Sequence, residues 1–156
     1  MWLFLAQNHE PMTHLPIATS ILAALAALLI LFVEKKELRW SWAVLTIVAF
    51  MAVVPTIATG IAAGVGRKYI EHGLLVTNIA ENSTIRYHQL LGLTGAVLAL
   101  INALLGLRFL RGKHVSKSLA VILALTIAII WSIGAHLGGK DLWSPDTFPG
   151  YEQSSK

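Results

Sequence analysis

The sequence predicts an all-α integral membrane protein, a four-helix up-down-up-down bundle with both termini on the outer side of the membrane. Of the 156 residues, 56% are hydrophobic and only 13% are charged, whereas soluble domains carry about 25% charged residues. Four apolar segments are long enough to cross a bilayer, and the basic residues gather in two short linkers. A chain of this length forms one domain, which we expect to span residues 1–156.

Each apolar segment has the length of a membrane-spanning helix, which needs about 20 residues. We expect the spans near residues 15–33, 41–64, 88–107 and 117–137. The short linkers favour an up-down-up-down arrangement of neighbouring helices. Pro16 should stand in the first turn of the first helix, where its missing N–H costs nothing. Pro55 should kink the second helix.

The distribution of charge predicts the orientation. Linkers 34–39 and 108–114, together with Lys117 at the start of the next helix, hold most of the lysines and arginines, whereas the termini and linker 66–87 hold most of the acids. By the positive-inside rule the two short linkers face the cytoplasm, so the termini face outward. In a bacterium this is the periplasmic side of the inner (cytoplasmic) membrane. Four tryptophans near span ends are expected as interfacial anchors: Trp40, Trp42, Trp131 and Trp143.

The composition excludes several kinds of site. Because the chain has no cysteine, it cannot form disulfides, thiolate zinc sites, iron–sulfur clusters or thioether-linked haem. No nucleophile–base triad, phosphate-binding loop or pair of carboxylates is visible. The net charge of +4 follows from the membrane orientation, so no nucleic acid partner is expected. Any cofactor must be held by histidine, by oxygen ligands or without a covalent bond.

Three histidines should reach the same outer level of the bundle. His14 opens the first helix, His88 opens the third, and His136 closes the fourth, which runs in the opposite direction. His9 and His72 lie just outside this level. A single histidine at a helix end is often only an interfacial anchor. Three on different helices at one depth favour a ligand site, since ionisable residues in spans usually mark function.

The third helix carries one continuous face of small residues below His88. That face runs through His88, Gly92, Gly95, Ala99, Asn102 and Gly106. Small residues allow close helix packing, and glycines near a histidine, Gly92 and Gly95 here, also leave room for a flat macrocycle. Arg86, two residues before His88, could pair with haem propionates or with lipid headgroups. Asn102 is expected to form an interhelical hydrogen bond or to contact a quinone.

Imidazole is the usual neutral ligand of haem iron, copper and zinc. Two imidazoles from facing helices would saturate one haem b, giving a bis-histidine electron-transfer centre. His14 with His88 would use diagonal helices, and His88 with His136 would use neighbouring ones; the sequence leaves both pairs open. The cytoplasmic level has no second tier of histidines, because His114 lies in a basic linker. Electrons should therefore be exchanged at the outer face only.

Four segments together resemble a bacterial family. HEPMTHLPIA, VVPTIATGI, YHQLLGLTG and SIGAHLGGKDLW are similar to motifs of a four-helix membrane domain of unknown function. The resemblance implies an integral membrane protein, sometimes fused to or neighbouring redox domains. It marks His9, His14, Pro16, Gly60, His88, Gly138 and Gly139. The chain departs from the family at Glu10, where proline is usual, and after Gly139.

Three functions fit these patterns. The first is a haem b-binding electron-transfer subunit at the periplasmic face, non-catalytic itself and part of an oxidoreductase complex. Its partners would be a periplasmic cytochrome, other redox subunits or a quinone. The second is a copper or zinc protein whose metal is held by converging imidazoles of His9, His14, His88 and His136. The third is a cofactor-free membrane anchor that holds a soluble redox partner, in which the histidines are dispensable and the small faces are packing surfaces only. The GxxxG pattern of Gly60 and Gly64 in the second helix is expected to be a packing contact.

Overall fold

The computed structural model describes residues 8–33, 35–66 and 83–142, and this part of the chain forms four helices without strands. They are α2 (His9–Phe32), α3 (Lys36–Gly66), α4 (Ser83–Leu110) and α5 (Lys117–Leu142). All four are long and apolar enough to cross a membrane. The expected all-α membrane bundle is confirmed.

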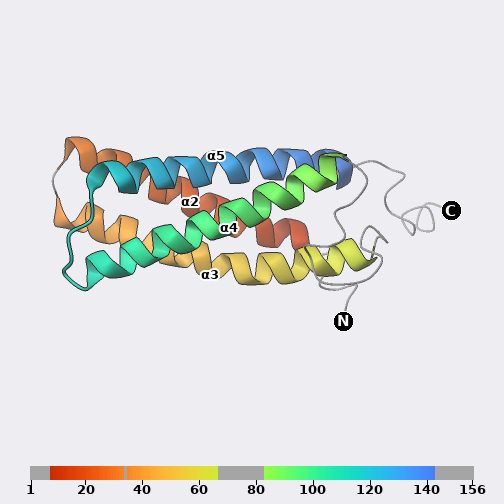
Figure 1. Cartoon of the computed structure of the whole chain (residues 1–156), viewed down its shortest axis with the longest axis horizontal. Coiled ribbons are helices and arrows are strands. Elements are labelled where there is room, and N and C mark those ends of the chain that lie inside the picture. Colours follow the sequence, from red (N-terminus) through yellow and green to blue (C-terminus); the bar gives the residue numbers. More distant parts are fainter. Residues whose placement is uncertain (1–7, 34, 67–82, 143–156) are drawn as a thin grey trace.

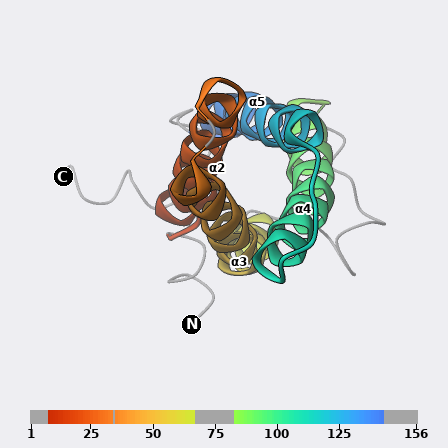
Figure 2. The same cartoon turned by 90° about the vertical axis from the view of Figure 1, so that its left-hand side faces the viewer.

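The four helices form a ring around one axis (Figures 1 and 2). Each helix packs against two others, α2 and α4 each lying against both α3 and α5. Consecutive helices run in opposite directions (Figure 1), and α2 and α4 lie diagonally opposite each other (Figure 2). This is the up-down-up-down arrangement that short linkers favour. The start of α2 and the end of α5 lie at the same end of the bundle (Figure 1), called the histidine end below.

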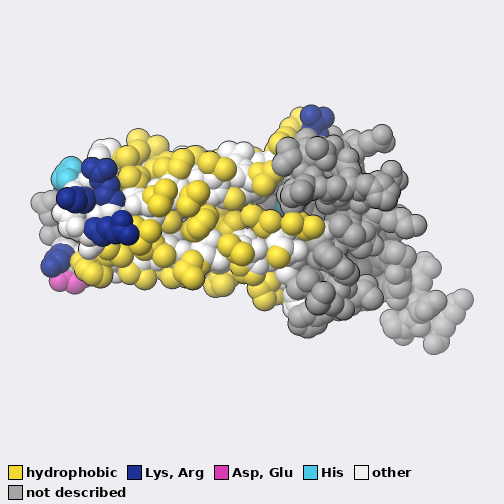
Figure 3. All heavy atoms as spheres, turned by 60° about the horizontal axis from the view of Figure 1, so that its bottom comes forward, with side chains coloured by type: hydrophobic (Ala, Val, Ile, Leu, Met, Phe, Trp, Pro, Cys, Tyr) yellow, Lys and Arg dark blue, Asp and Glu magenta, His cyan; other side chains and the backbone are white. Residues whose placement is uncertain are grey.

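The interior of the bundle is built from small side chains. The buried core is dominated by alanines, among them Ala27, Ala43 and Ala124. Large apolar side chains point outward instead, and Phe32 is 82% exposed and Met51 66% exposed. Figure 3 shows the flank of the bundle covered by hydrophobic side chains. In a bilayer lipid solvates such side chains, and small residues let helix backbones approach closely.

The opposite end of the bundle, called the basic end below, collects positive charge (Figure 3). Its described residues include Lys35, Lys36, Arg39, Arg108, Arg111, Lys113 and Lys117. Helix α4 ends there in a Schellman motif: Lys113 N–H donates to the Arg108 carbonyl at 3.1 Å, and Gly112 N–H to that of Phe109 at 2.9 Å. Gly112 has φ +75°, a left-handed conformation that glycine adopts without strain.

Two of the four tryptophans expected as interfacial anchors lie inside the bundle instead. Trp42 is 2% exposed and Trp131 is 8% exposed. Trp42 packs edge-on against Phe109, with ring centroids 6.4 Å apart. Both tryptophans lie on the side of their helix that faces the other helices. The prediction used only their distance from a span end, which does not say which side of the helix a residue occupies. Trp40 is exposed as an anchor would be, and Trp143 lies outside the described residues.

Candidate functional site

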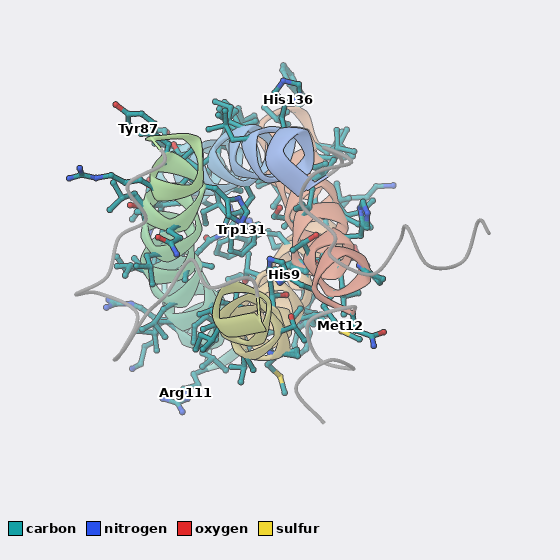
Figure 4. All side chains as sticks on the ribbon, turned by 90° about the vertical axis from the view of Figure 1, so that its right-hand side faces the viewer. His9, Met12, Tyr87, Arg111, Trp131 and His136 are labelled. Atoms are coloured by element: carbon teal, nitrogen blue, oxygen red, sulfur yellow. The ribbon has the colours of Figure 1, made fainter. Side chains whose placement is uncertain are left out.

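Two imidazoles meet at the histidine end of the bundle. His9 comes from the first turn of α2 and His88 from the second turn of α4. Their ring centroids are 6.2 Å apart, and the ring planes stand at 82° to each other. Figure 4 shows His9 projecting between the helices. The pair thus crosses the diagonal of the bundle.

The contact of His9 with Thr59 favours one tautomer of the imidazole. Its Nδ1 lies 3.2 Å from Thr59 Oγ1. The Thr59 hydroxyl is also within 2.9 Å and 3.0 Å of the Pro55 and Thr56 carbonyl oxygens, and it donates its single proton there. The threonine oxygen therefore accepts from His9 Nδ1–H. In the neutral ring this places the lone pair on Nε2.

The hydrogen bond of His88 fixes the same tautomer. Its Nδ1 lies 2.7 Å from the carbonyl oxygen of Gly134 on α5. A carbonyl can only accept, so Nδ1–H donates and the lone pair of the neutral ring stands on Nε2. Metal-binding histidines are commonly held in this way, with the second ring nitrogen donating to a carbonyl or another acceptor. The Nδ1 contact of each ring is thus of the kind that metal-binding histidines make.

Two glycines bring helix backbones against these rings. A Cβ on Gly60 of α3 would come within 2.9 Å of His9 Cε1, and one on Gly138 of α5 within 2.8 Å of His88 Cε1. No larger residue fits without moving the imidazole. The resemblance marked both glycines, whereas the GxxxG pattern gave Gly60 a packing role only. Thr59 and Gly134 were missed, because their roles depend on contacts between helices.

The structure does not bring His14 and His136 to this pair, because both side chains are exposed. His14 follows His9 by five residues, so it stands about 140° further around the helix. His136 lies two residues from Gly134 and Gly138, almost opposite the face that meets His88, and Figure 4 shows it directed away from the bundle. Within the described residues, the four-imidazole cluster expected for copper or zinc is not formed.

The small face of α4 is only partly open. A Cβ on Gly95 would clash with the indole of Trp131, whereas one on Gly92 would meet nothing within 4 Å. The room expected for a flat ring beside Gly95 is therefore filled by Trp131. Arg86 is exposed near the start of α4. His72 lies outside the described residues.

A side-chain hydrogen bond holds the first turns of α2 in place. Helix α2 begins at His9, so Pro16 lies inside the helix and not in its first turn as expected. Proline has no N–H, which leaves the Met12 carbonyl without its helical donor. Thr56 Oγ1 of α3 lies 2.9 Å from that carbonyl oxygen and 2.8 Å from the Ala52 carbonyl oxygen of its own helix, so the two carbonyls share one hydroxyl proton. This contact ties the turn that follows His9 to α3.

A family model with the description "Predicted membrane protein (DUF2231)" matches residues 9–146. The matched region includes all four helices and both imidazoles of the site. No curated protein and no solved structure matches the chain.

Proposed function

The chain belongs to the DUF2231 family of predicted membrane proteins, and we propose that it is a haem b-binding electron-transfer subunit with His9 and His88 as axial ligands. The site would face the periplasm from the bacterial inner membrane. The subunit would work inside a larger redox complex. Its basic end would face the cytoplasm, as the positive-inside rule requires.

The spacing of the two imidazoles carries this proposal. An imidazole nitrogen binds a metal ion at about 2 Å, so two rings on opposite sides of one ion have centres about 6 Å apart. The centroids of His9 and His88 are 6.2 Å apart. With Nδ1–H donating to Thr59 in one ring and to the Gly134 carbonyl in the other, Nε2 of each ring would be the ligating atom. The described residues contain no group of three His, Asp or Glu side chains that could hold a metal, and a structural zinc site needs four ligands.

The residues around His88 leave room for a macrocycle at the level of His88, but not one turn deeper in the bundle. Gly92 offers an open face one turn below His88, whereas Trp131 fills the next level at Gly95. Arg86 lies at the same end of α4 and could pair with propionates. Gly92 and Arg86 thus keep their expected roles in the proposal. Gly95 instead makes room for Trp131, and His14 and His136 are replaced by His9.

A bound haem b would supply reversible one-electron transfer. His9 and His88 would both hold its iron, so the group would exchange electrons without binding a substrate. Thr59 and the Gly134 carbonyl would hold the imidazoles in the ligating tautomer and orientation. Because both imidazoles lie at the histidine end, electrons would enter and leave on that side. The exchange partner would be a periplasmic cytochrome, another redox subunit or a quinone.

Alanine substitutions test the ligand pair. In detergent-purified protein from haem-supplied cells, we expect the reduced-minus-oxidised spectrum to show a sharp b-type α band. His9→Ala and His88→Ala should each remove it. His14→Ala and His136→Ala are matched controls that should retain it, since both side chains point outward.

Other outcomes would contradict the proposal in distinct ways. Loss of the band in either control variant would return the ligand role to His14 or His136. A wild-type protein without visible absorption but with one copper ion per chain would favour a metal held by the same two imidazoles. A protein with neither would favour the membrane anchor.

A further inference from the structure

A small polar cavity lies deep in the bundle. It has a volume of about 10 Å³, and its polar lining consists of Ser20 of α2, Thr46 of α3 and Asn102 of α4. The rest of its wall is formed by alanines and Ile127. These three polar residues are at most 3% exposed. Three helices thus bring polar side chains to one point in an otherwise apolar span.

The carboxamide oxygen of Asn102 lacks a partner there. Its Oδ1 is buried and accepts no hydrogen bond. Gly106, one turn further along α4, lets this helix approach Thr46 of α3 closely, because a Cβ at Gly106 would lie 2.7 Å from Thr46 Oγ1. The interhelical hydrogen bond expected for Asn102 is not formed directly. An unsatisfied buried acceptor costs about 1–3 kcal/mol, so this position calls for a donor.

The two hydroxyl groups cannot supply that donor. Ser20 Oγ–H donates to the Ile17 carbonyl oxygen at 2.8 Å, and Thr46 Oγ–H to that of Ala43 at 2.8 Å. Each hydroxyl oxygen therefore offers only lone pairs to the cavity. The site presents three acceptors, and what fills it must bring hydrogen atoms.

We infer that one water molecule occupies this cavity and donates hydrogen bonds to Asn102 Oδ1 and to the hydroxyl oxygen of Ser20 or Thr46. One water needs roughly 10–15 Å³ and two to four polar partners, which this cavity supplies. A quinone ring is far too large for it. A bare cation would find no carboxylate among the lining residues, and charge in a span is costly. The water would join α2, α3 and α4 near the centre of the bundle.

Proton NMR of the full chain in detergent tests this inference. In protein labelled with ¹⁵N-asparagine, the Asn102 side-chain amide should show a cross-peak to a long-lived water, identified by NOE and ROE of opposite sign. The double variant Ser20→Ala, Thr46→Val should lose the cross-peak while keeping the Asn102 resonance. Ser132→Ala is the matched control and should leave it intact, because Ser132 also donates to its own helix but is exposed.

Three results would overturn the inference. One is a wild-type protein without the cross-peak, since the cavity would then be dry. Another is a cross-peak that survives in the double variant, since the water would then lie elsewhere. The third is an Asn102 resonance that shifts when sodium replaces choline, which would indicate a cation. Because none of these readouts depends on haem, failure here leaves the proposed ligand pair untouched.

Discussion

At the scale of single residues, two glycines decide whether the imidazoles can stay in place. Gly60 and Gly138 lie so close to His9 and His88 that a Cβ would come within 3 Å of each ring. Moving either ring away from its glycine would break its hydrogen bond to Thr59 or to the Gly134 carbonyl. The site therefore depends on the absence of two side chains as much as on the presence of two.

We expect Gly138→Ala to displace the imidazole of His88, destabilise the protein by about 1–3 kcal/mol and remove more than half of the bound haem. The haem-to-protein ratio and a thermal melt measure both effects. Gly134→Ala is the matched control, because its Cβ would make an ordinary contact 3.5 Å from Leu91 Cβ and its carbonyl remains. Equal behaviour of the two variants would refute the steric argument.

Gly92 offers a second test at this scale, separate from overall stability. Nothing lies within 4 Å of a Cβ at this position. Gly92→Ala should therefore change the free energy of unfolding of the haem-free protein by less than about 1 kcal/mol, as measured in a thermal melt. If a macrocycle lies against α4, the same variant should bind haem more weakly. Unchanged haem affinity would place the macrocycle away from this face.

At the scale of elements, the proline of α2 is compensated by a threonine of α3. Pro16 removes the donor of the Met12 carbonyl, and the Thr56 hydroxyl of the neighbouring helix, which it shares with the Ala52 carbonyl, lies within hydrogen-bond distance instead. Helix breakers are tolerated in membrane helices where side chains satisfy the backbone groups they leave without a donor. An internal defect of one helix thus becomes a link between two.

We expect Thr56→Val to destabilise the bundle by about 1 kcal/mol, measured by unfolding in mixed micelles. Thr56→Ser keeps the hydroxyl and should cost less. Pro16→Ala restores an N–H for the Met12 carbonyl, so Thr56→Val should cost little in that background. An equal cost in both backgrounds would show that the hydroxyl does not serve this carbonyl.

At the scale of the whole molecule, the separation of the basic end from the histidine end predicts which side of the membrane holds the site. The chain has no cysteine of its own, so a maleimide reagent labels only the single cysteine that is introduced. Arg86→Cys should react with an impermeant maleimide in intact spheroplasts. Lys113→Cys should react only after the membrane is opened. The reverse pattern would place the site on the cytoplasmic side.

Hydropathy and charge alone predicted the four helices of the described residues, their order and the basic end of the bundle. The hydropathy of a span and the charge of a linker are summed over many residues, so an error of a few positions in a boundary does not change the number of spans or their orientation. The start of α2 shows the limit: apolar composition placed it near residue 15, whereas the helix begins at His9. The linker charges likewise predicted the basic end without reference to any contact.

Which side chains meet follows from the packing of the helices and not from the sequence pattern. His14, His88 and His136 share one depth in the sequence, but depth leaves rotation about each helix undetermined. Because α2 begins at His9 and turns that residue inward, His14 must face outward. The partners Thr59, Gly60, Gly134 and Gly138 come from α3 and α5. Their roles exist only where helix backbones approach within contact distance, which composition and periodicity do not encode.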